Sequence, residues 1–292
     1  MNLLDELGKG KLLVSDGAWG TFLQAKGLQG GECPELWNVT RRGDVLDIAK
    51  SYIAAGSDII ETNSFGGSRI KLAQYGLGDR TVELNEAASA ISREAAGSDK
   101  IVAGSVGPTG KMLLMGDVTE EELYNTFSEQ VTALAKGGAD MIIIETMLDI
   151  TEAALAVRAA RENTTCVVAA TMTFSKTIQG EYRTMMGVSP AEMVIALKDA
   201  GAHVVGSNCG NGIADMKGIV DAIRLVDQAI PVLIQANAGI PELVDGNTVF
   251  RETPGMMASH VRALVSSGAC IIGGCCGTTP DHIRAIVSEV RK

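Results

Sequence analysis

The amino-acid sequence predicts a single α/β domain over residues 1–292, folded as a (β/α)8 barrel, also called a TIM barrel. Three observations favour this class. The length is close to the roughly 250 residues typical of such a barrel. Short apolar segments rich in Val and Ile alternate with helical segments eight times. These apolar segments lack the regular polar alternation of half-exposed strands, as expected for parallel strands covered on both faces.

Four of the expected strands follow a glycine that ends a helix. The segments are "AGSDIIETN" from Ala55, "GGADMIIIET" from Gly137, "AGAHVVGSNC" from Ala200 and "SGACIIGGCC" from Ser267. Glycine is common just after a helix because it adopts a left-handed backbone without steric cost. The glycines are spaced by about two βα units of roughly 30–40 residues each, which predicts one further strand in each interval.

The further strands complete the set of eight. They are expected at residues 11–18, 100–108, 166–174 and 231–239. Helix starts are indicated by Thr119 with Glu122, a capping-box pattern, and by Pro at the first position of "SPAEM" (189–193) and "TPDHI" (279–283). The alternative is a doubly wound open sheet, but its usual glycine-rich turn after the first strand is absent from "DGAWGT".

Composition narrows the class of partner. The chain has 25 basic and 35 acidic residues, a formal charge of −10 and no basic tract, which argues against nucleic acid or an anionic membrane as a partner. No apolar stretch approaches the roughly 18 residues of a membrane span, and the N-terminus lacks the pattern of a signal peptide, so we expect a soluble, cytoplasmic protein. In that reducing compartment the six cysteines are expected to be thiols or metal ligands rather than disulfides.

Polar residues and thiols gather where the expected strands end. In a TIM barrel the active site lies at the carboxyl ends of the strands, so these residues are the candidates for chemistry. Three thiols on one rim fit Zn²⁺ with one open coordination position, which is the catalytic pattern, although buried cysteines can also be small core residues. The strand ends are Asp16-Gly17, Glu61-Thr62-Asn63, Glu145-Thr146, Asn208-Cys209 and Gly274-Cys275-Cys276.

Four motifs resemble the homocysteine S-methyltransferase family: "DGAWGT" (16–21), "ETNSFGGS" (61–68), "GSNCGNG" (206–212) and "GGCCGTTPDHI" (273–283). The resemblance implies a TIM barrel enzyme that binds zinc through Cys209, Cys275 and Cys276. It also implies that Asp16, Gly17 and Glu145 bind the amino acid end of homocysteine, with Glu145 at the ammonium group. We expect Glu61, Asn63 and Asn208 to orient groups around the zinc, which would hold the thiol as the attacking thiolate.

The methyl donor is the open question. Similarity to the homocysteine-binding module of cobalamin-dependent methionine synthase, including "NAGIPEL" (237–243), favours a methylated corrinoid as the donor. We expect no pterin or cobalamin module within residues 1–292, so the corrinoid would be carried by a separate protein. The alternatives are S-methylmethionine or another onium donor, methyl transfer to or from another thiol, and a non-catalytic zinc- or thiol-binding barrel. An onium donor favours an aromatic cage, and aromatic residues make up only 4% of the chain.

The remaining distinctive residues receive structural interpretations. Trp19 stands where similar sequences carry a smaller apolar residue, so the pocket beside Asp16 is expected to differ in shape. The methionine-rich segments at 111–116 and 183–187 are expected to pack rather than form a lid. We expect no catalytic role for three other cysteines and the three histidines: Cys33, Cys166, Cys270, His203, His260 and His282.

Overall fold

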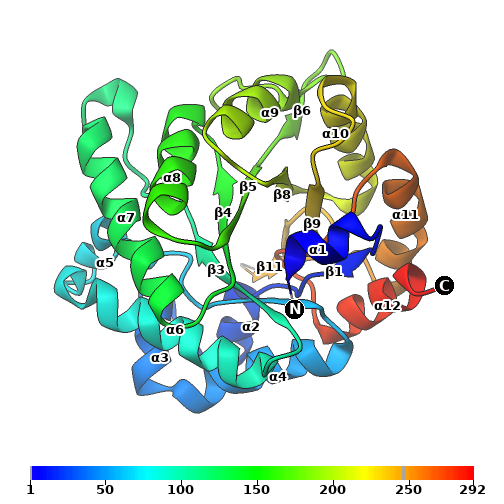
Figure 1. The fold of residues 1–292 in the computed structure, drawn as a ribbon. Helices are drawn as coiled ribbons and strands as arrows, with labels where there is room; N and C mark the ends of the chain where they lie inside the picture. The colour runs from blue at the N-terminus through cyan, green and yellow to red at the C-terminus, as the bar shows by residue number, and fades with distance from the viewer. Residues whose placement is uncertain (1, 245–246) are drawn as a thin grey trace.

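The computed structural model describes residues 2–244 and 247–292, and it confirms the predicted barrel (Figure 1). Within these residues eight strands form one sheet in the order β1-β12-β9-β8-β5-β4-β3-β2, and every pairing in it is parallel. The strands are β1 (Leu13–Val14), β2 (Ile59–Glu61), β3 (Ile101–Val106), β4 (Met141–Met147), β5 (Val167–Met172), β8 (Val204–Gly212), β9 (Val232–Asn237) and β12 (Ile271–Gly274).

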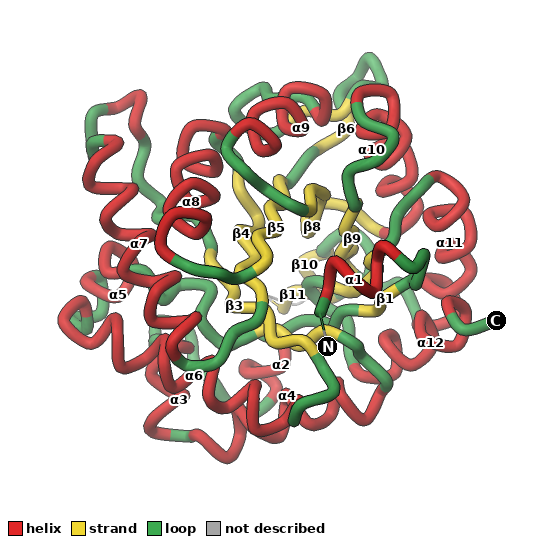
Figure 2. Tube along the Cα trace, in the orientation of Figure 1, coloured by secondary structure: helices red, strands yellow, loops and turns green. Residues whose placement is uncertain are grey.

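Helices surround the ring of strands, as Figure 2 shows with helices in red and strands in yellow. The helices are α1 (Leu3–Gly8), α2 (Gly20–Ala25), α3 (Trp37–Thr40), α4 (Arg42–Ala55), α5 (Arg69–Ala73), α6 (Thr81–Ala96), α7 (Glu120–Lys136), α8 (Ile150–Asn163), α9 (Pro190–Asp199), α10 (Ile213–Val226), α11 (Pro254–Ser267) and α12 (Pro280–Val290).

The expected helix boundaries are confirmed. Gly56, Gly138, Gly201 and Gly268 have φ values of 104°, 111°, 103° and 108°, a left-handed backbone that favours glycine. Capping boxes begin α7 at Thr119 and α9 at Ser189. Thr279 begins α12 in the same way, with His282 Nδ1 accepting from its backbone N–H at 3.1 Å. Local signals therefore position the helices that lie between the strands.

The interior of the barrel is apolar at its N-terminal end. Leu3 of α1 packs there with residues that the strands point inward, among them Leu13, Ile59, Ile101 and Met141. Figure 1 shows α1 lying in front of the ring of strands at this end. Burial of such side chains contributes roughly 1.5–3 kcal/mol each and makes this end the closed floor of the barrel.

The barrel closes between β1 and β2 by a few individual hydrogen bonds. The Asp58 backbone N–H donates to the Val14 carbonyl at 2.7 Å, and the Glu61 N–H donates to Asp16 Oδ2 at 2.9 Å. A side-chain carboxylate thus replaces a backbone acceptor at this seam. Asp16 has a structural role in the barrel in addition to any chemical one.

Loops at the C-terminal ends of the strands differ from the prediction. The methionine-rich segments pack only in part: Leu113 packs against the core, but Leu114, Met115 and Met185 are 81%, 70% and 84% exposed. The predicted packing is therefore wrong for these three side chains, which lie in loops beyond the strand ends. Two hairpins that the sequence did not predict lie in the loops after β5 and β9: β6 (Ser175–Lys176) with β7 (Tyr182–Arg183), and β10 (Glu242–Val244) with β11 (Asn247–Val249).

Candidate functional site

A cavity of about 280 Å³ opens at the C-terminal ends of the strands. Its wall has two parts. Strand ends contribute acids and thiols, including Glu61, Glu145 and Cys209, and the turn after β12 adds Cys275 and Cys276. The segments that follow β1 and β2, including the start of α2, contribute apolar and aromatic residues, chiefly Trp19, Leu23, Pro34 and Phe65, which form the loop part of the wall.

Three thiols meet in this cavity. The sulfur atoms of Cys209, Cys275 and Cys276 all lie within 4.8 Å of one another. A tetrahedral ion with metal–sulfur bonds of about 2.3 Å holds its sulfur ligands about 3.8 Å apart, so small side-chain movements suffice to enclose an ion. The three residues could hold a metal ion and leave one coordination position facing the cavity.

The backbone explains why adjacent cysteines converge. Strand β12 ends at Gly274, so Cys275 and Cys276 lie outside the alternation of the strand. A turn follows, in which the Thr278 N–H donates to the Cys275 carbonyl at 3.1 Å and Gly277 has a φ of 79°. Cys209 itself has a φ of 59°, which is costly for a residue other than glycine and is typical of functional sites.

The thiols share negative charge. Hydrogen bonds from Cys275 and Cys276 lower the pKa of Cys209 to about 2, and Asn237 also hydrogen-bonds its side chain. The same contacts raise the pKa of Cys275 well above its usual range and, with burial, that of Cys276 to about 12. Without a cation the cluster therefore favours a single thiolate, whereas a divalent ion would stabilise all three.

Buried carboxyl groups surround the thiols. Burial raises the pKa of Glu145 to about 7, although Ser105 Oγ donates to its Oε1 and Asn208 Nδ2 donates to its Oε2 at 3.1 Å. Burial and repulsion by Glu145 and Asp16 raise the pKa of Glu61 well above its usual range. Among the described residues that line the cavity, none is Lys, Arg or His. The site would therefore be stabilised by positive charge on a ligand.

The chain matches a known protein family over most of its length. Residues 13–290 match the model of the family described as homocysteine S-methyltransferase. The chain belongs to this enzyme family. The match runs from β1 to the last turn of α12 and includes every residue of the thiol cluster.

Methionine synthases are among the similar curated proteins. The chain is 32% identical to that of Mycobacterium tuberculosis, over 99% of this chain and 25% of that protein. It is 29% identical to that of Mycobacterium leprae, over 100% of this chain and 25% of that protein. The chain thus spans about a quarter of the length of these relatives.

Solved structures agree on the fold. The metallated form of the homocysteine methyltransferase MmuM from Escherichia coli superposes with a TM-score of 0.77, at 24% identity and 99% coverage of both chains. The oxidized form of the same protein gives a TM-score of 0.78 at 22% identity, with the same coverage. At these identities the likeness supports the barrel and not a shared substrate.

Some of the predicted substrate-binding residues line the cavity, and others lie behind its wall. Gly17, Glu61, Asn63 and Glu145 line the cavity. Asp16 lies behind the wall, 1% exposed, where its Oδ2 accepts the Glu61 N–H and Trp19 Nε1–H, each at 2.9 Å. Within the described part of the chain its buried Oδ1 has no hydrogen-bond partner.

Asn208 also lies behind the cavity wall. It is fully buried, and its Oδ1 accepts the Thr146 N–H and the Thr171 hydroxyl, each at 2.8 Å. Its Nδ2 donates to Thr146 Oγ1 at 2.7 Å as well as to Glu145. Thr146 has a φ of 60°, so Asn208 stabilises a strained backbone beside Glu145.

Asn63 lines the cavity, but its amide is used in the loop. Nδ2 donates to the Pro34 carbonyl at 2.8 Å and to Asn38 Oδ1 at 3.0 Å. These bonds tie the loop that carries Pro34 to the end of β2. The amide group is therefore committed to positioning the cavity wall.

Glycines permit close packing behind the thiols. A Cβ on Gly17 would lie 2.6 Å from Thr278 Oγ1, and one on Gly273 would lie 1.9 Å from Ser15 Oγ. The absence of a side chain at Gly273 thus lets β12 approach β1 closely. Both contacts bring the loop after β1 next to the cysteine pair.

Sequence reasoning missed three polar residues of the site. Ser105 bonds Glu145, Gln235 Nε2 donates to Glu61 Oε1 at 2.6 Å, and Asn237 bonds Cys209. All three are polar residues near the ends of otherwise apolar strands. That pattern was available in "AGSV" and "LIQAN", but their partners come from other strands.

Two cysteines and one histidine outside the cluster hydrogen-bond the backbone of neighbouring strands and loops. Cys166 Sγ donates to the Ala139 carbonyl at 3.3 Å and Cys270 Sγ to the Val232 carbonyl at 3.4 Å. His203 Nδ1 accepts the Val168 N–H at 2.9 Å. None of these side chains lines the cavity.

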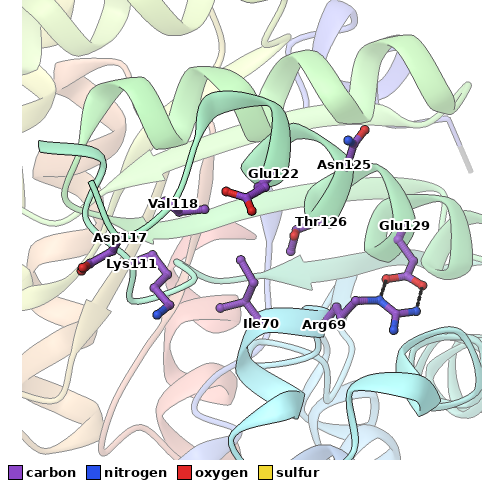
Figure 3. Close-up of a pocket in the computed structure, with 9 residues that line it drawn as sticks. All are labelled: Arg69, Ile70, Lys111, Asp117, Val118, Glu122, Asn125, Thr126 and Glu129. Carbon is purple, nitrogen blue, oxygen red and sulfur yellow. Dashed lines mark hydrogen bonds and ion pairs between the residues drawn. The ribbon is translucent and has the colours of Figure 1, made fainter. Parts of the chain in front are cut away.

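A second, larger cavity of about 560 Å³ lies on the outside of the barrel between α5 and α7. Figure 3 shows its charged wall, in which Arg69 is paired with Glu129. Arg69 also pairs with Asp79 at 3.0 Å, so its charge is already balanced. None of the described residues that line this groove carries a thiol.

No helix within residues 2–244 and 247–292 is long and apolar enough to cross a membrane.

Proposed function

We propose that this chain transfers a methyl group to the thiol of homocysteine and forms methionine, with Zn²⁺ held by Cys209, Cys275 and Cys276. The observation that carries the proposal is the meeting of three sulfur atoms within 4.8 Å, in a cavity lined by buried acids, in a member of this family. Three soft thiolate ligands fit zinc, and the open position fits a substrate sulfur.

The metal and the two acidic residues would have different roles in binding homocysteine. When bound, zinc would supply the positive charge that keeps the substrate thiol deprotonated near neutral pH. Glu145, fixed by Ser105 and Asn208, accepts the substrate ammonium group. Glu61 lines the same cavity, fixed by Gln235, and adds negative charge near Glu145. Charge-assisted hydrogen bonds of this kind are roughly twice as strong as neutral ones.

The methyl transfer is a substitution at carbon. The substrate sulfur provides the electron pair for the new sulfur–carbon bond, and the donor leaves with the pair of the bond that breaks. The thiol proton leaves to solvent before the attack, so that the substrate reacts as its thiolate. The chain's own residues orient the two substrates for this step and exclude competing nucleophiles.

A methylated corrinoid protein is our first candidate for the donor. Apolar side chains are exposed on loops that follow strand ends around the cavity, among them Phe65, Leu114, Met115, Met185 and Leu243. Exposed apolar groups of this kind suit a protein surface that carries the methyl group. The similar methionine synthases, in which the matched region is only a quarter of the chain, support the same choice.

An onium donor such as S-methylmethionine is the second candidate. The cavity has three acids in its wall, Glu35, Glu61 and Glu145, together with the aromatic rings of Trp19 and Phe65. Acids and aromatic faces without a basic side chain stabilise a cationic ligand. The low overall aromatic content does not exclude such a site, because two of the few rings lie in it.

The deciding experiment is an assay of methionine formation from homocysteine with methylcobalamin or S-methylmethionine as the donor. The active chain should contain about one zinc per molecule. Absence of product with either donor, or full activity of zinc-free protein, would contradict the proposal.

Glu145→Gln tests the substrate contact. It removes the charge that faces the ammonium group and keeps the shape, so the homocysteine KM should rise by roughly tenfold or more while zinc content stays the same. Glu83→Gln on the exposed surface of α6 is the control. A parallel loss of zinc in the Glu145 variant would mean that the residue supports the metal site instead.

A further inference from the structure

Trp19 is the largest side chain in the loop part of the cavity wall, and the helix it begins does not require it. It is the N-cap of α2, a position that normally favours Ser, Thr, Asp or Asn. Its side chain makes no capping hydrogen bond. Its indole instead lines the cavity and packs on the core, partly buried.

The orientation of the indole is set from behind. Trp19 Nε1–H donates to Asp16 Oδ2 at 2.9 Å, and that oxygen also accepts the Glu61 backbone N–H at 2.9 Å. Asp16 is 1% exposed and does not line the cavity. A buried carboxyl oxygen that accepts from two N–H donors is held firmly, because water does not compete for these bonds. Asp16 thus ties the indole ring to the end of β2.

The ring lies on the side from which a donor must come. Loops of a TIM barrel extend outward beyond the strand ends that carry the thiols. The thiols come from the end of β8 and the turn after β12, whereas Trp19, Leu23 and Phe65 come from the loop part of the wall. A methyl group approaching a sulfur held by the thiol cluster passes this loop part of the wall.

From these contacts we infer that Trp19 is a specificity-determining residue for the methyl donor, and that Asp16 is the positioning residue that orients its indole. This inference rests on the proposed function, since it assigns a wall of the same cavity to the donor. It predicts that changes at Trp19 act on the donor and leave the thiol substrate and the metal ligands unaffected.

The test uses two substitutions in the full chain. Trp19→Phe keeps an aromatic ring and removes the N–H, and Trp19→Leu removes the ring. Methionine formation is measured with methylcobalamin and with S-methylmethionine. We expect the KM of the donor that the wild-type chain uses to rise about threefold for Trp19→Phe and at least tenfold for Trp19→Leu. The homocysteine KM and the zinc content should stay within twofold.

The chain offers a matched control and a second readout. It has two tryptophans, and Trp37 lies in the core against Arg41, outside the cavity. Trp37→Phe should leave both KM values unchanged and leaves Trp19 as the sole tryptophan. Methionine, which carries the transferred methyl group, should then change the Trp19 emission in a saturable way. If Trp37→Phe does not fold, Trp37→Tyr serves in its place.

The outcomes distinguish a failure of the inference about Trp19 from a failure of the proposed function. An active wild-type chain whose donor KM is unaffected by both Trp19 variants would overturn the inference and leave the proposed function standing. Equal losses of zinc, homocysteine affinity and donor affinity would also overturn it, because they indicate a structural role. A wild-type chain that forms no methionine with either donor would overturn the proposed function and this inference with it.

Discussion

The two ends of the barrel are built from the same strands and differ in almost every other respect. At the N-terminal end, Leu3 closes an interior of Leu, Ile and Met side chains. At the C-terminal end, acids and thiols are buried, and Thr146 and Cys209 are the residues other than glycine with positive φ in the described chain. Apolar burial at one end offsets strain and desolvation at the other, an arrangement expected of a functional site.

Unpaired polar atoms sharpen this contrast. Buried oxygens without a partner in the described residues include Asp16 Oδ1, Gln235 Oε1 and Asn237 Oδ1, all near the cavity. Such atoms cost free energy unless a ligand or water satisfies them. The oxygens near the cavity are therefore available to what the C-terminal end binds, whereas the N-terminal end has one comparable atom among the described residues, Ser57 Oγ before β2.

The largest expected effect is that of replacing Cys276, which follows β12. Cys270, which precedes the same strand, provides the control. Cys276→Ser should lose the metal and lower methyl transfer by more than about 100-fold, because even residues that only support a ligand contribute 10–100-fold. Cys270→Ser, at the start of β12, should retain both, since its thiol only donates to the Val232 carbonyl. Metal analysis and the methionine assay measure the difference. Metal retained in the Cys276 variant would contradict the ligand assignment.

Removal of the apolar floor should affect stability alone. Leu3 is 3% exposed, and Leu3→Ala should lower the free energy of unfolding by about 2–4 kcal/mol. Leu4, its neighbour, is 36% exposed, and Leu4→Ala should change it by less than about 0.5 kcal/mol. Denaturant unfolding gives both values. A changed homocysteine KM in the Leu3 variant would show that the two ends are coupled.

The buried acids predict a dependence of stability on pH. Burial raises the pKa of Asp16 and of Glu145 to about 7, so the folded state binds protons that the unfolded state has released. Their contribution is present below about pH 4 and is lost as the pH rises through about 7. Together the two groups should therefore lower the free energy of unfolding of the metal-free chain by on the order of 5 kcal/mol between pH 5 and pH 8. Glu145→Gln should reduce this loss in urea unfolding, and Glu121→Gln on the exposed surface of α7 should not.

The smallest expected effect concerns the exposed loops. Met115→Ser and Leu243→Ser should change the free energy of unfolding by less than about 0.5 kcal/mol, because both side chains are mostly exposed. If a corrinoid protein is the donor, its KM should rise while that of free methylcobalamin stays constant. Equal effects on both donors would argue against a docking role for these loops.

The sequence by itself determined the barrel and the members of the thiol cluster. Apolar strands, glycines such as Gly56 and capping pairs such as Thr119 with Glu122 act locally, so the elements that they begin or end can be predicted from the sequence alone. The positions of Cys209 and Cys276 at strand ends were equally local, and parallel strands bring their carboxyl ends together in any barrel.

Only the tertiary structure decided which side chains face the cavity and which support it. Asp16 and Asn208 lie behind the wall, while Ser105 and Gln235 complete the acids from other strands. The exposure of Met115 and the bond between Trp19 and Asp16 likewise depend on what lies nearby in space. Hydrogen-bond partners and burial follow from strand register and side-chain direction across distant segments, and no local pattern of residues encodes them.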